Sequence, residues 1–558
     1  MAATLLLLTA CGEDEENVAA DVYCEEGFAY SFAELPQPGA VPGWPEYICK
    51  DDHVYYAVSG GPPEARIIDL YYSALGSDTA TELGAYLADL FHGCVMDDGT
   101  LLGCFENYDS EEITLLHIDA GGGILLNKRL DCLSVPENCI SKYISYDNEG
   151  RIYIMFGGIK AFLCVLDSGG DRLLFSLDVK NAADMARTSS GEIAIGQPAR
   201  GEYDGAPDDP DTYSGYLIRL VDADAGTWGE SRELLGVYSG LADGADYELY
   251  LHEPENMFGY DFSGNKLTRL INWLDNGIEL SSRHCVLGGG RFISLITYPG
   301  EQSKYCLMTR GTEPAAEPVT LKLATMNGDA FRGDVAAFNK ASESVKIELL
   351  DYSEINGEGA DAGRLRLAAE MLSGYMPDII DLASFDSRAY ISKNLLEDLY
   401  PFLTGDAGID MDDFWPNVLK ALEYEGALYE LVPGFSIAAA MVRQSDGDET
   451  VWTAESFKAL LANGAGYTSL FGSDVSRSEF LSLMVMYNSG SLLDRESGQA
   501  FFDTAGFVEM LSLSAALPAE SEPQSFGEEL FLGRQAALMT TVMQPVDLDM
   551  IRAYFRQD

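Results

Sequence analysis

Between about residues 45 and 310 the sequence repeats one pattern, in which short runs of apolar, β-branched and aromatic residues alternate with turn residues. In one copy, residues 248–273, the runs ELYLH, MFGYDF and KLTRLINW are separated by turns at PEN and SGN. Related copies follow residues 99, 150 and 290. Each copy begins just after a glycine-containing turn, and these glycines lie about 40 to 50 residues apart. The pattern predicts a meander of antiparallel strands, repeated along the chain.

A repeat of this length with about four strands per unit is typical of the blades of a β-propeller. Residues 20–312 have room for about six blades, and seven would also fit. An array of β-sandwiches is the alternative, but sandwiches do not usually repeat one meander at this interval. We therefore expect an all-β propeller in the first half of the chain.

The pattern changes to mixed α/β after a proline-containing segment, residues 311–318. Strands are expected at 319–324, 345–350 and 378–382, with helices at 331–340 and 364–372 between them. Strands and helices that alternate in this way build parallel βαβ units with right-handed crossovers.

This second half resembles bacterial extracellular solute-binding lipoproteins, the family 1 type of substrate-binding protein that serves ABC importers, many of them sugar importers. The resemblance runs from Leu321 to about Phe531 and rests on the order of several elements, which are VTLKLAT, AFNKASESVKIELLDYSE, LAAEMLSGYMPDIIDL, YISKNLLEDLYPFL, ALEYEGALYELVPGF and VWTAESFKALLA. It implies a two-lobed α/β domain of the periplasmic-binding-protein type, in which a ligand is captured by closure of the lobes. Family members continue beyond the element ELFLGRQAALM, so we expect the second lobe to be incomplete here.

Candidate ligand-binding residues follow from the strand ends, because ligands of open parallel sheets bind beyond the carboxyl ends of the strands. Aromatic faces can stack on sugars, and Asp, Asn and Ser can hydrogen-bond to hydroxyl groups. Core packing is the alternative role for the aromatic residues, and helix capping is the alternative for Ser384 and Asp386. Pro433 and Gly434 interrupt a strand and are the expected hinge. The candidates are Asn327, Asp329, Ser384, Asp386, Trp415, Tyr424, Tyr429, Phe435, Trp452, Tyr487 and Asn488.

The amino terminus, LLLLTACGEDEEN, changes from apolar to acidic at Cys11. The order Leu-x-Ala-Cys resembles the bacterial lipobox, which implies cleavage before Cys11, lipidation of its sulfur and tethering to the outer face of the cell membrane. No Lys or Arg precedes Leu5 and the apolar run is short, so we expect residues 1–10 to be a partial signal peptide whose start is missing. The expected organisation is then an acidic tether at 11–19, the propeller at 20–312, a linker at 313–318, a first lobe at 319–435 and a second lobe at 436–558.

The chain carries 90 acidic and 35 basic residues, a net charge of −55, which argues against nucleic acid as a partner. The expected partners are an oligosaccharide and an ABC permease, and the protein is expected to act as a monomer. Of the ten cysteines, nine remain when Cys11 is set aside, so they cannot all pair within the chain. Cys132 and Cys139 could bridge a local loop, whereas most of the others are expected to be buried thiols.

No catalytic residue, metal ligand or cofactor is predicted, because the five histidines all lie before residue 285 and none stands in a known motif. We therefore expect a binding protein without enzymatic activity. Two alternatives remain open. The propeller could bind a protein or glycan as a surface sensor or adhesion module, or it could hold two carboxylates that hydrolyse a glycan.

Overall fold

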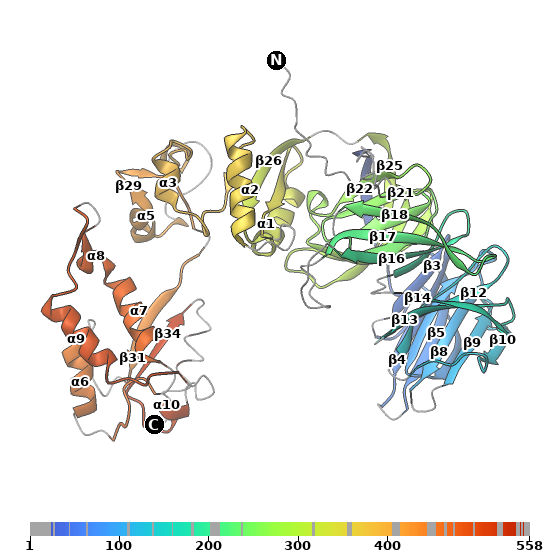
Figure 1. Cartoon of the computed structure of the whole chain (residues 1–558), viewed down its shortest axis with the longest axis horizontal. Helices are drawn as coiled ribbons and strands as arrows, with labels where there is room; N and C mark the ends of the chain where they lie inside the picture. The colour runs from blue at the N-terminus through green and yellow to red at the C-terminus, as the bar shows by residue number, and fades with distance from the viewer. Residues whose placement is uncertain are drawn as a thin grey trace, which may run out of the picture. The chain divides into compact units, whose positions relative to one another are not determined.

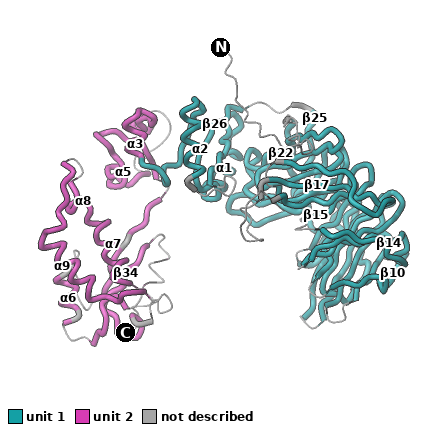
Figure 2. Tube along the Cα trace, in the orientation of Figure 1, with its two compact units in different colours: residues 1–386 teal, residues 387–558 magenta. Residues whose placement is uncertain are grey.

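The computed structural model describes residues 24–25, 28–43, 45–62, 65–108, 112–136, 139–158, 160–179, 184–200, 213–235, 238–314, 318–353, 360–403, 413–432, 434–443, 453–462, 466–472, 475–494, 497–521, 528–542, 547 and 551. The chain divides into two compact units, residues 1–386 and 387–558 (Figures 1 and 2). Cys11 and the acidic tether lie outside the described residues. The predicted domain boundaries at 312 and 435, and the cleft between two lobes, stay predictions.

Six antiparallel sheets form a six-bladed β-propeller in the first unit, which confirms the predicted fold of this half. Each of the first four blades contains four consecutive strands. The first contains β3 (Glu46–Lys50), β4 (His53–Gly60), β5 (Ile67–Ala74) and β6 (Thr81–Leu87), and the second contains β7 (Leu90–Val95), β8 (Leu101–Asn107), β9 (Glu112–Ile118) and β10 (Ile124–Arg129). The third contains β11 (Cys139–Tyr146), β12 (Ile152–Gly158), β13 (Ala161–Leu166) and β14 (Leu173–Val179), and the fourth contains β15 (Asp184–Arg187), β16 (Ile193–Arg200), β17 (Tyr213–Asp222) and β18 (Thr227–Leu235).

The last two blades each receive a strand from the start of the chain. The fifth contains β19 (Gly240–Ala242), β20 (Leu249–His252), β21 (Asn256–Asp261) and β22 (Lys266–Asn272), beside which β1 (Cys24–Glu25) lies parallel. The sixth contains β23 (Leu280–Gly288), β24 (Arg291–Thr297) and β25 (Lys304–Pro314), and β2 (Phe28–Glu34) pairs antiparallel with β25 from Phe28↔Pro314 to Glu34↔Cys306. The two ends of the propeller sequence are therefore joined within one sheet.

The glycine-containing turns used to define the repeat lie inside the blades rather than at their starts, which corrects the predicted repeat boundaries. Gly99, Gly150 and Gly191 connect the first and second strands of their blades and have φ values of +79°, +76° and +91°. Each three-strand copy is thus preceded by one more strand, such as β7 before Gly99. These first strands escaped detection because they carry polar and small residues at positions that the pattern expects to be apolar.

A small α/β layer follows the propeller within the first unit. The parallel sheet has the order β27-β26-β28, in which β26 (Val319–Thr325) lies between β27 (Val345–Asp351) and β28 (Ile379–Ile380). The helices α1 (Gly328–Ala341) and α2 (Ala360–Leu372) connect the strands, as predicted. Leu274, in the 3-10 helix η2 (Leu274–Asn276), packs with Leu323, Val335, Ala336 and Leu349, so this layer shares a core with the propeller.

Among its described residues, the second unit contains more helix than strand. Its helices are α3 (Ser387–Ile391), α4 (Tyr400–Leu403), α5 (Pro416–Leu422), α6 (Ala454–Ala462), α7 (Arg477–Tyr487), α8 (Ser489–Leu492), α9 (Ala505–Ser514) and α10 (Glu528–Phe531). Its short antiparallel pairs are β29 (Glu423–Tyr424) with β30 (Ala427–Leu428), β31 (Ile437–Val442) with β34 (Ala537–Val542), and β32 (Leu493–Asp494) with β33 (Gln499–Ala500). The Thr453 hydroxyl accepts a hydrogen bond from the Ser456 amide at 3.1 Å and so caps the start of α6.

Candidate functional site

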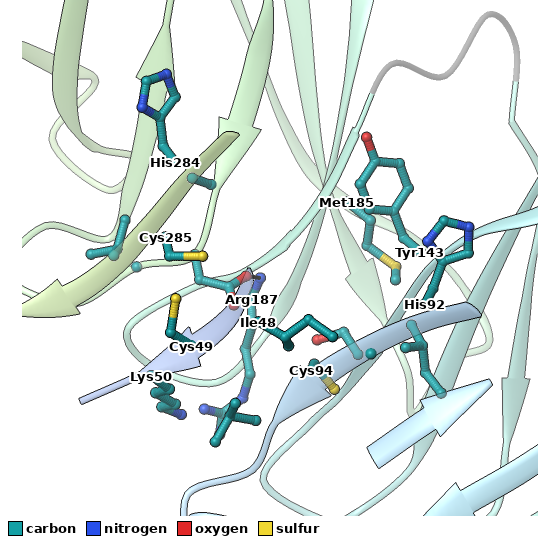
Figure 3. A pocket seen from close by; sticks show the side chains of 18 of the residues that line it. Ile48, Cys49, Lys50, His92, Cys94, Tyr143, Met185, Arg187, His284 and Cys285 are labelled. Atoms are coloured by element: carbon teal, nitrogen blue, oxygen red, sulfur yellow. Dashed lines mark hydrogen bonds between the residues drawn. The ribbon is translucent and has the colours of Figure 1, made fainter. Parts of the chain in front are cut away.

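The innermost strands of all six blades line a central cavity of about 400 Å³ (Figure 3). The side chains that reach it include thiols, rings, two lysines and an arginine, and they come from β3, β7, β11, β15, β19 and β23. Each of these strands is the edge strand of its blade and turns that edge toward the central axis, so polar side chains near the edge can point into the cavity. The labelled side chains in Figure 3 are Ile48, Cys49, Lys50, His92, Cys94, Tyr143, Met185, Arg187, His284 and Cys285.

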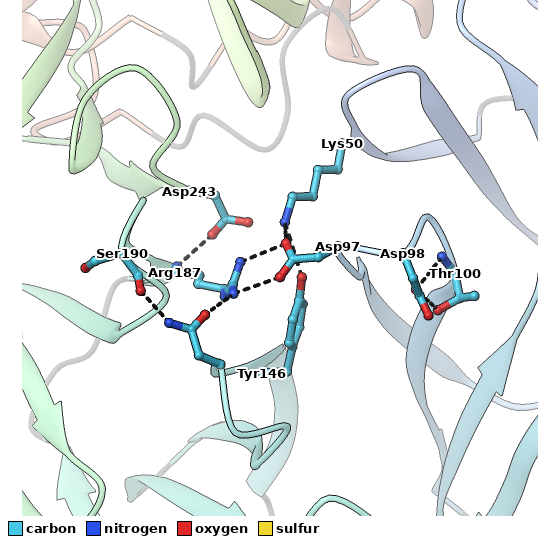
Figure 4. Close-up of polar contacts among 9 residues, drawn as sticks. Lys50, Asp97, Asp98, Thr100, Tyr146, Arg187, Ser190 and Asp243 are labelled. Atoms are coloured by element: carbon cyan, nitrogen blue, oxygen red, sulfur yellow. Dashed lines mark hydrogen bonds and ion pairs between the residues drawn. The ribbon is translucent and has the colours of Figure 1, made fainter.

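Five polar side chains from four blades meet where these inner strands end (Figure 4). The Arg187 guanidinium donates two hydrogen bonds to Asp97, at 3.1 and 3.0 Å, and a third to Asn148 at 2.7 Å. It also lies 4.4 Å from the ring centroid of Tyr146. Lys50 forms an ion pair with Asp97 and donates to the Tyr146 hydroxyl at 3.2 Å. The arrangement ties the first four blades together at one end of the cavity.

The charges of this cluster shift the pKa of Asp97. Partial burial of the carboxylate acts to raise its pKa, but hydrogen bonds from Lys50 and Tyr146 and the positive charges of Lys50 and Arg187 outweigh it and lower the pKa to about 2. Asp243 accepts a hydrogen bond from the backbone amide of Arg187 at 2.8 Å, so a second carboxylate contacts the backbone of this arginine. Two carboxylates therefore lie beside one arginine at the end of the cavity.

A second polar link joins the inner strands farther along the axis. Asp184 accepts hydrogen bonds from the Tyr143 hydroxyl and from the Leu241 amide, the latter at 3.1 Å, which connects β15 with β11 and β19. Burial raises the pKa of Asp184 despite these donors. The arrangement keeps a buried carboxyl group satisfied and fixes the spacing of three neighbouring blades.

The carboxyl edge of the α/β sheet carries four of the predicted ligand-binding residues. Asn327 and Asp329 follow β26, Ser384 and Asp386 follow β28, and all four are exposed. Asn327 stands at the start of α1 without a side-chain capping bond, and Asp329 forms an ion pair with Arg332 at 3.8 Å. The structure thus brings two predicted loops to one edge of the sheet.

Two further carboxylates at this edge were not predicted. Asp381 accepts a hydrogen bond from the Thr325 hydroxyl at 2.8 Å, and Asp351 accepts one from the Gly328 amide at 3.1 Å. Both residues directly follow apolar strand segments, LL and II, and this signal could have been used to find them. Their bonds show that they hold the loops that carry the exposed candidates.

The second unit brings two of the predicted aromatic residues together. The rings of Trp415 and Phe435 meet edge to face, with centroids 6.2 Å apart and planes at 77°. Trp415 is 66% exposed and Phe435 48% exposed, so core packing does not account for either ring. Tyr424 is half-buried, and the Arg388 guanidinium lies 5.7 Å from its ring centroid. Tyr429 is also half-buried, just after β30.

The remaining candidates fall at separate places. Tyr487 lines an apolar cavity of about 550 Å³ in the second unit, between α7 and the pair β31–β34. Asn488 caps the end of α7, since its side-chain amide donates to the Met484 carbonyl at 2.8 Å. Gly434 is exposed, whereas Trp452 and Pro433 lie outside the described residues. The roles assigned to these residues stay predictions.

Within the described part of the chain, no cluster of three or more His, Cys, Asp or Glu side chains is arranged to hold a metal ion. The helices in that same part are all too short or too polar to cross a membrane.

No family model matches the sequence, and no curated protein matches it. Among solved structures, an ABC substrate-binding protein from Listeria monocytogenes in complex with cycloalternan is 18% identical over 40% of this chain and 61% of its own, with a TM-score of 0.26. The sugar-binding protein MalE from Xanthomonas citri is 17% identical over 42% and 62%, with a TM-score of 0.30. An α-L-arabinanase from Penicillium chrysogenum, complexed with arabinobiose, is 12% identical over 50% and 96%, with a TM-score of 0.34. This chain spans less than two thirds of both binding proteins, and TM-scores this low identify neither a shared fold nor a shared activity.

Proposed function

We propose that the chain captures a carbohydrate, as the tethered solute-binding subunit of an ABC importer on the outer face of the membrane. The observation that carries the proposal is the exposed pair Trp415 and Phe435, two of the predicted ligand-binding residues. Exposed rings that meet edge to face offer a rigid apolar surface on which the C–H face of a sugar can stack.

The polar edge of the α/β sheet supports the same proposal. Asn327, Asp329, Ser384 and Asp386 present hydrogen-bonding groups to solvent at the carboxyl ends of parallel strands, where ligands of such sheets bind. The proposal assigns no chemistry to the protein, only binding and delivery to a permease. The lipid anchor at Cys11 is part of the proposal and rests on the lipobox-like sequence alone.

The test is calorimetric titration of the full chain with short neutral oligosaccharides, maltotriose and cellotriose among them. The Trp415→Ala variant should bind at least about tenfold more weakly, a loss of about 1.4 kcal/mol or more. Folding should be unaffected, because Trp415 precedes α5 and makes no side-chain capping bond.

Phe531→Ala is the matched control, because Phe531 is an aromatic residue of similar exposure, 47%, in the same unit and was not a candidate. An equal loss in both variants, or saturable binding that Trp415→Ala leaves unchanged, would overturn the assignment of the aromatic pair. For the anchor, replacement of Cys11 by Ala in the natural host should release the protein from the membrane fraction.

The propeller offers a second candidate site, since Arg187 donates hydrogen bonds to both Asp97 and Asp243 at the end of its central cavity. A glycan-active propeller needs two carboxylates beside one cavity. Hydrolysis of a polysaccharide that is lost in Asp243→Asn but unaffected in Trp415→Ala would favour this function over transport.

A further inference from the structure

The ring of blades closes between β3 of the first blade and β23 of the sixth, and this junction carries one cysteine on each side. Cys49 lies in β3, where it pairs with Val54 of β4, and Cys285 lies in β23, where it pairs with Ile293 of β24. Both belong to innermost strands and both line the central cavity. In Figure 3 their sulfur atoms point toward each other.

Contacts between the two strands hold the thiols in this position. The Cys285 thiol donates a hydrogen bond to the Tyr47 carbonyl at 3.5 Å, so a group of β23 is bound to the backbone of β3. The Cys285 thiol lies close enough to Cys49 to add to the rise in the pKa of Cys49. The Tyr47 ring stacks on Tyr305 of the sixth blade, with centroids 3.8 Å apart. The pair is therefore placed by its surroundings rather than by chance approach of free side chains.

We propose that Cys49 and Cys285 form a disulfide that locks the propeller ring. The oxidant is a low-molecular-weight disulfide. One thiolate of the pair attacks it, forms a mixed disulfide and releases one thiol. The second thiolate then attacks the protein sulfur of this mixed disulfide, which forms the Cys49–Cys285 bond and releases the second thiol. Two protein thiols are oxidised while one disulfide is reduced to two thiols.

The surroundings also determine how fast the bond forms. Burial raises the pKa of Cys49 well above its ordinary value, and the neighbouring Cys285 adds to the effect. The thiolate is therefore scarce near neutral pH, so oxidation should be slow there and faster in alkaline buffer. The cavity gives a small disulfide a route to both residues, which line it and are half-buried.

The bond would join residues 236 positions apart in sequence. Disulfides that close long loops restrict the unfolded chain most. A disulfide that closes a loop of this length should raise the melting temperature of the propeller by roughly 5 to 10 °C. The bond would act together with β2, which closes the same ring at its outer edge.

The experiment treats the folded full chain with oxidised glutathione at about pH 8.5, blocks the remaining thiols with iodoacetamide and maps the peptides by mass spectrometry. A linked peptide pair that contains Cys49 and Cys285, lost on reduction and accompanied by the higher melting temperature, is the expected result. Cys49→Ser and Cys285→Ser should each abolish the linked pair. Cys94→Ser is the matched control, because Cys94 lines the same cavity and is likewise half-buried, and it should leave the linked pair intact.

The proposal is overturned if the native protein, with its near-ultraviolet circular dichroism unchanged, yields Cys49 only as the free thiol or as its glutathione adduct. It is also overturned if Cys94 replaces either partner in the linked peptides. The wild-type chain alone decides the outcome, so a variant that fails to fold does not affect the test.

Discussion

Acid should weaken the propeller through a pair of histidines between its fifth and sixth blades. The rings of His252 and His284 lie 4.7 Å apart at 60°, and His284 stacks on the fully buried Trp273 at 5.4 Å with nearly parallel planes. The His284 Nδ1 hydrogen-bonds with the Ser294 hydroxyl at 2.8 Å. Burial lowers the pKa of His252 to about 4, and burial together with the charge of His252 lowers the pKa of His284 well below its ordinary value.

The sign of the effect follows from proton binding. In the unfolded chain a histidine titrates near about pH 6.5, so below that pH the unfolded state binds a proton that the folded state does not accept until about pH 4. Stability present at neutral pH is therefore lost as the pH falls through this window. Between about pH 7 and pH 5 the His252 equilibrium alone should remove about 2 kcal/mol from the free energy of unfolding. His284 adds to the loss in the same direction.

Buried carboxyl groups act in the opposite direction. Burial raises the pKa of Glu253 and of Asp184, so the folded state accepts their protons more readily and gains stability as the pH falls. The total pH profile is thus a sum of opposing contributions. The informative quantity is the difference between the wild type and a variant that lacks only one histidine.

The assay is urea unfolding of the wild type and of His252→Gln, followed by near-ultraviolet circular dichroism at several pH values from about 7 to 5. The stability of the wild type relative to the variant should fall by about 2 kcal/mol over this range. Tyr238→Phe is the control, because burial raises the pKa of Tyr238 to about 12 and it cannot titrate in the window. A difference between wild type and His252→Gln that stays constant with pH would refute the reasoning.

Two further predictions concern the turns at the end of the central cavity. A Cβ at Gly244 would lie 2.1 Å from the Glu248 carbonyl oxygen, so Gly244→Ala should lower the free energy of unfolding in urea by about 1–3 kcal/mol. Gly264 has open space around it, so Gly264→Ala should stay within about 0.5 kcal/mol of the wild type. Equal effects of the two substitutions would show that the structure relieves the clash at Gly244. Asp97→Asn should lower the free energy of unfolding by only about 1 kcal/mol at neutral pH, because this carboxylate is 60% exposed and water screens its ion pairs with Lys50 and Arg187. The difference in stability between the two proteins should disappear as the pH falls toward the Asp97 pKa of about 2, because the wild type then also loses the charge. A difference that persists at that pH would contradict an electrostatic origin.

Much of the fold could be predicted from the pattern of the sequence. The outer strands of each blade alternate with glycine turns, and the βαβ units have clear strand and helix periods, so both were recognised. The innermost strands were missed because they face the central cavity. β19 has only three residues, and β7 contains His92, Gly93 and Cys94 in succession, so neither shows the alternation of a half-buried strand.

The candidate sites were less predictable, since they depend on contacts between distant residues. The end of the apolar strand marked Asn327 and Asp329, but nothing local could show that Asp351 and Asp381 hold the neighbouring loops. Trp415 and Phe435 lie 20 positions apart, and only the fold brings their rings together. The cluster of Asp97 and Arg187 joins residues 90 positions apart and leaves no local signal.

The pairing of β2 with β25 sets the order in which the ring can be completed. β2 is synthesised before β3 to β25 and can pair only with a strand almost three hundred residues later, because Phe28 faces Pro314. Until then, the edge of β2 has nothing to pair with, and closing so long a loop slows folding. The five blades in between can form as local meanders while the chain emerges. The last blade is therefore the step at which a nascent chain is most exposed to mispairing.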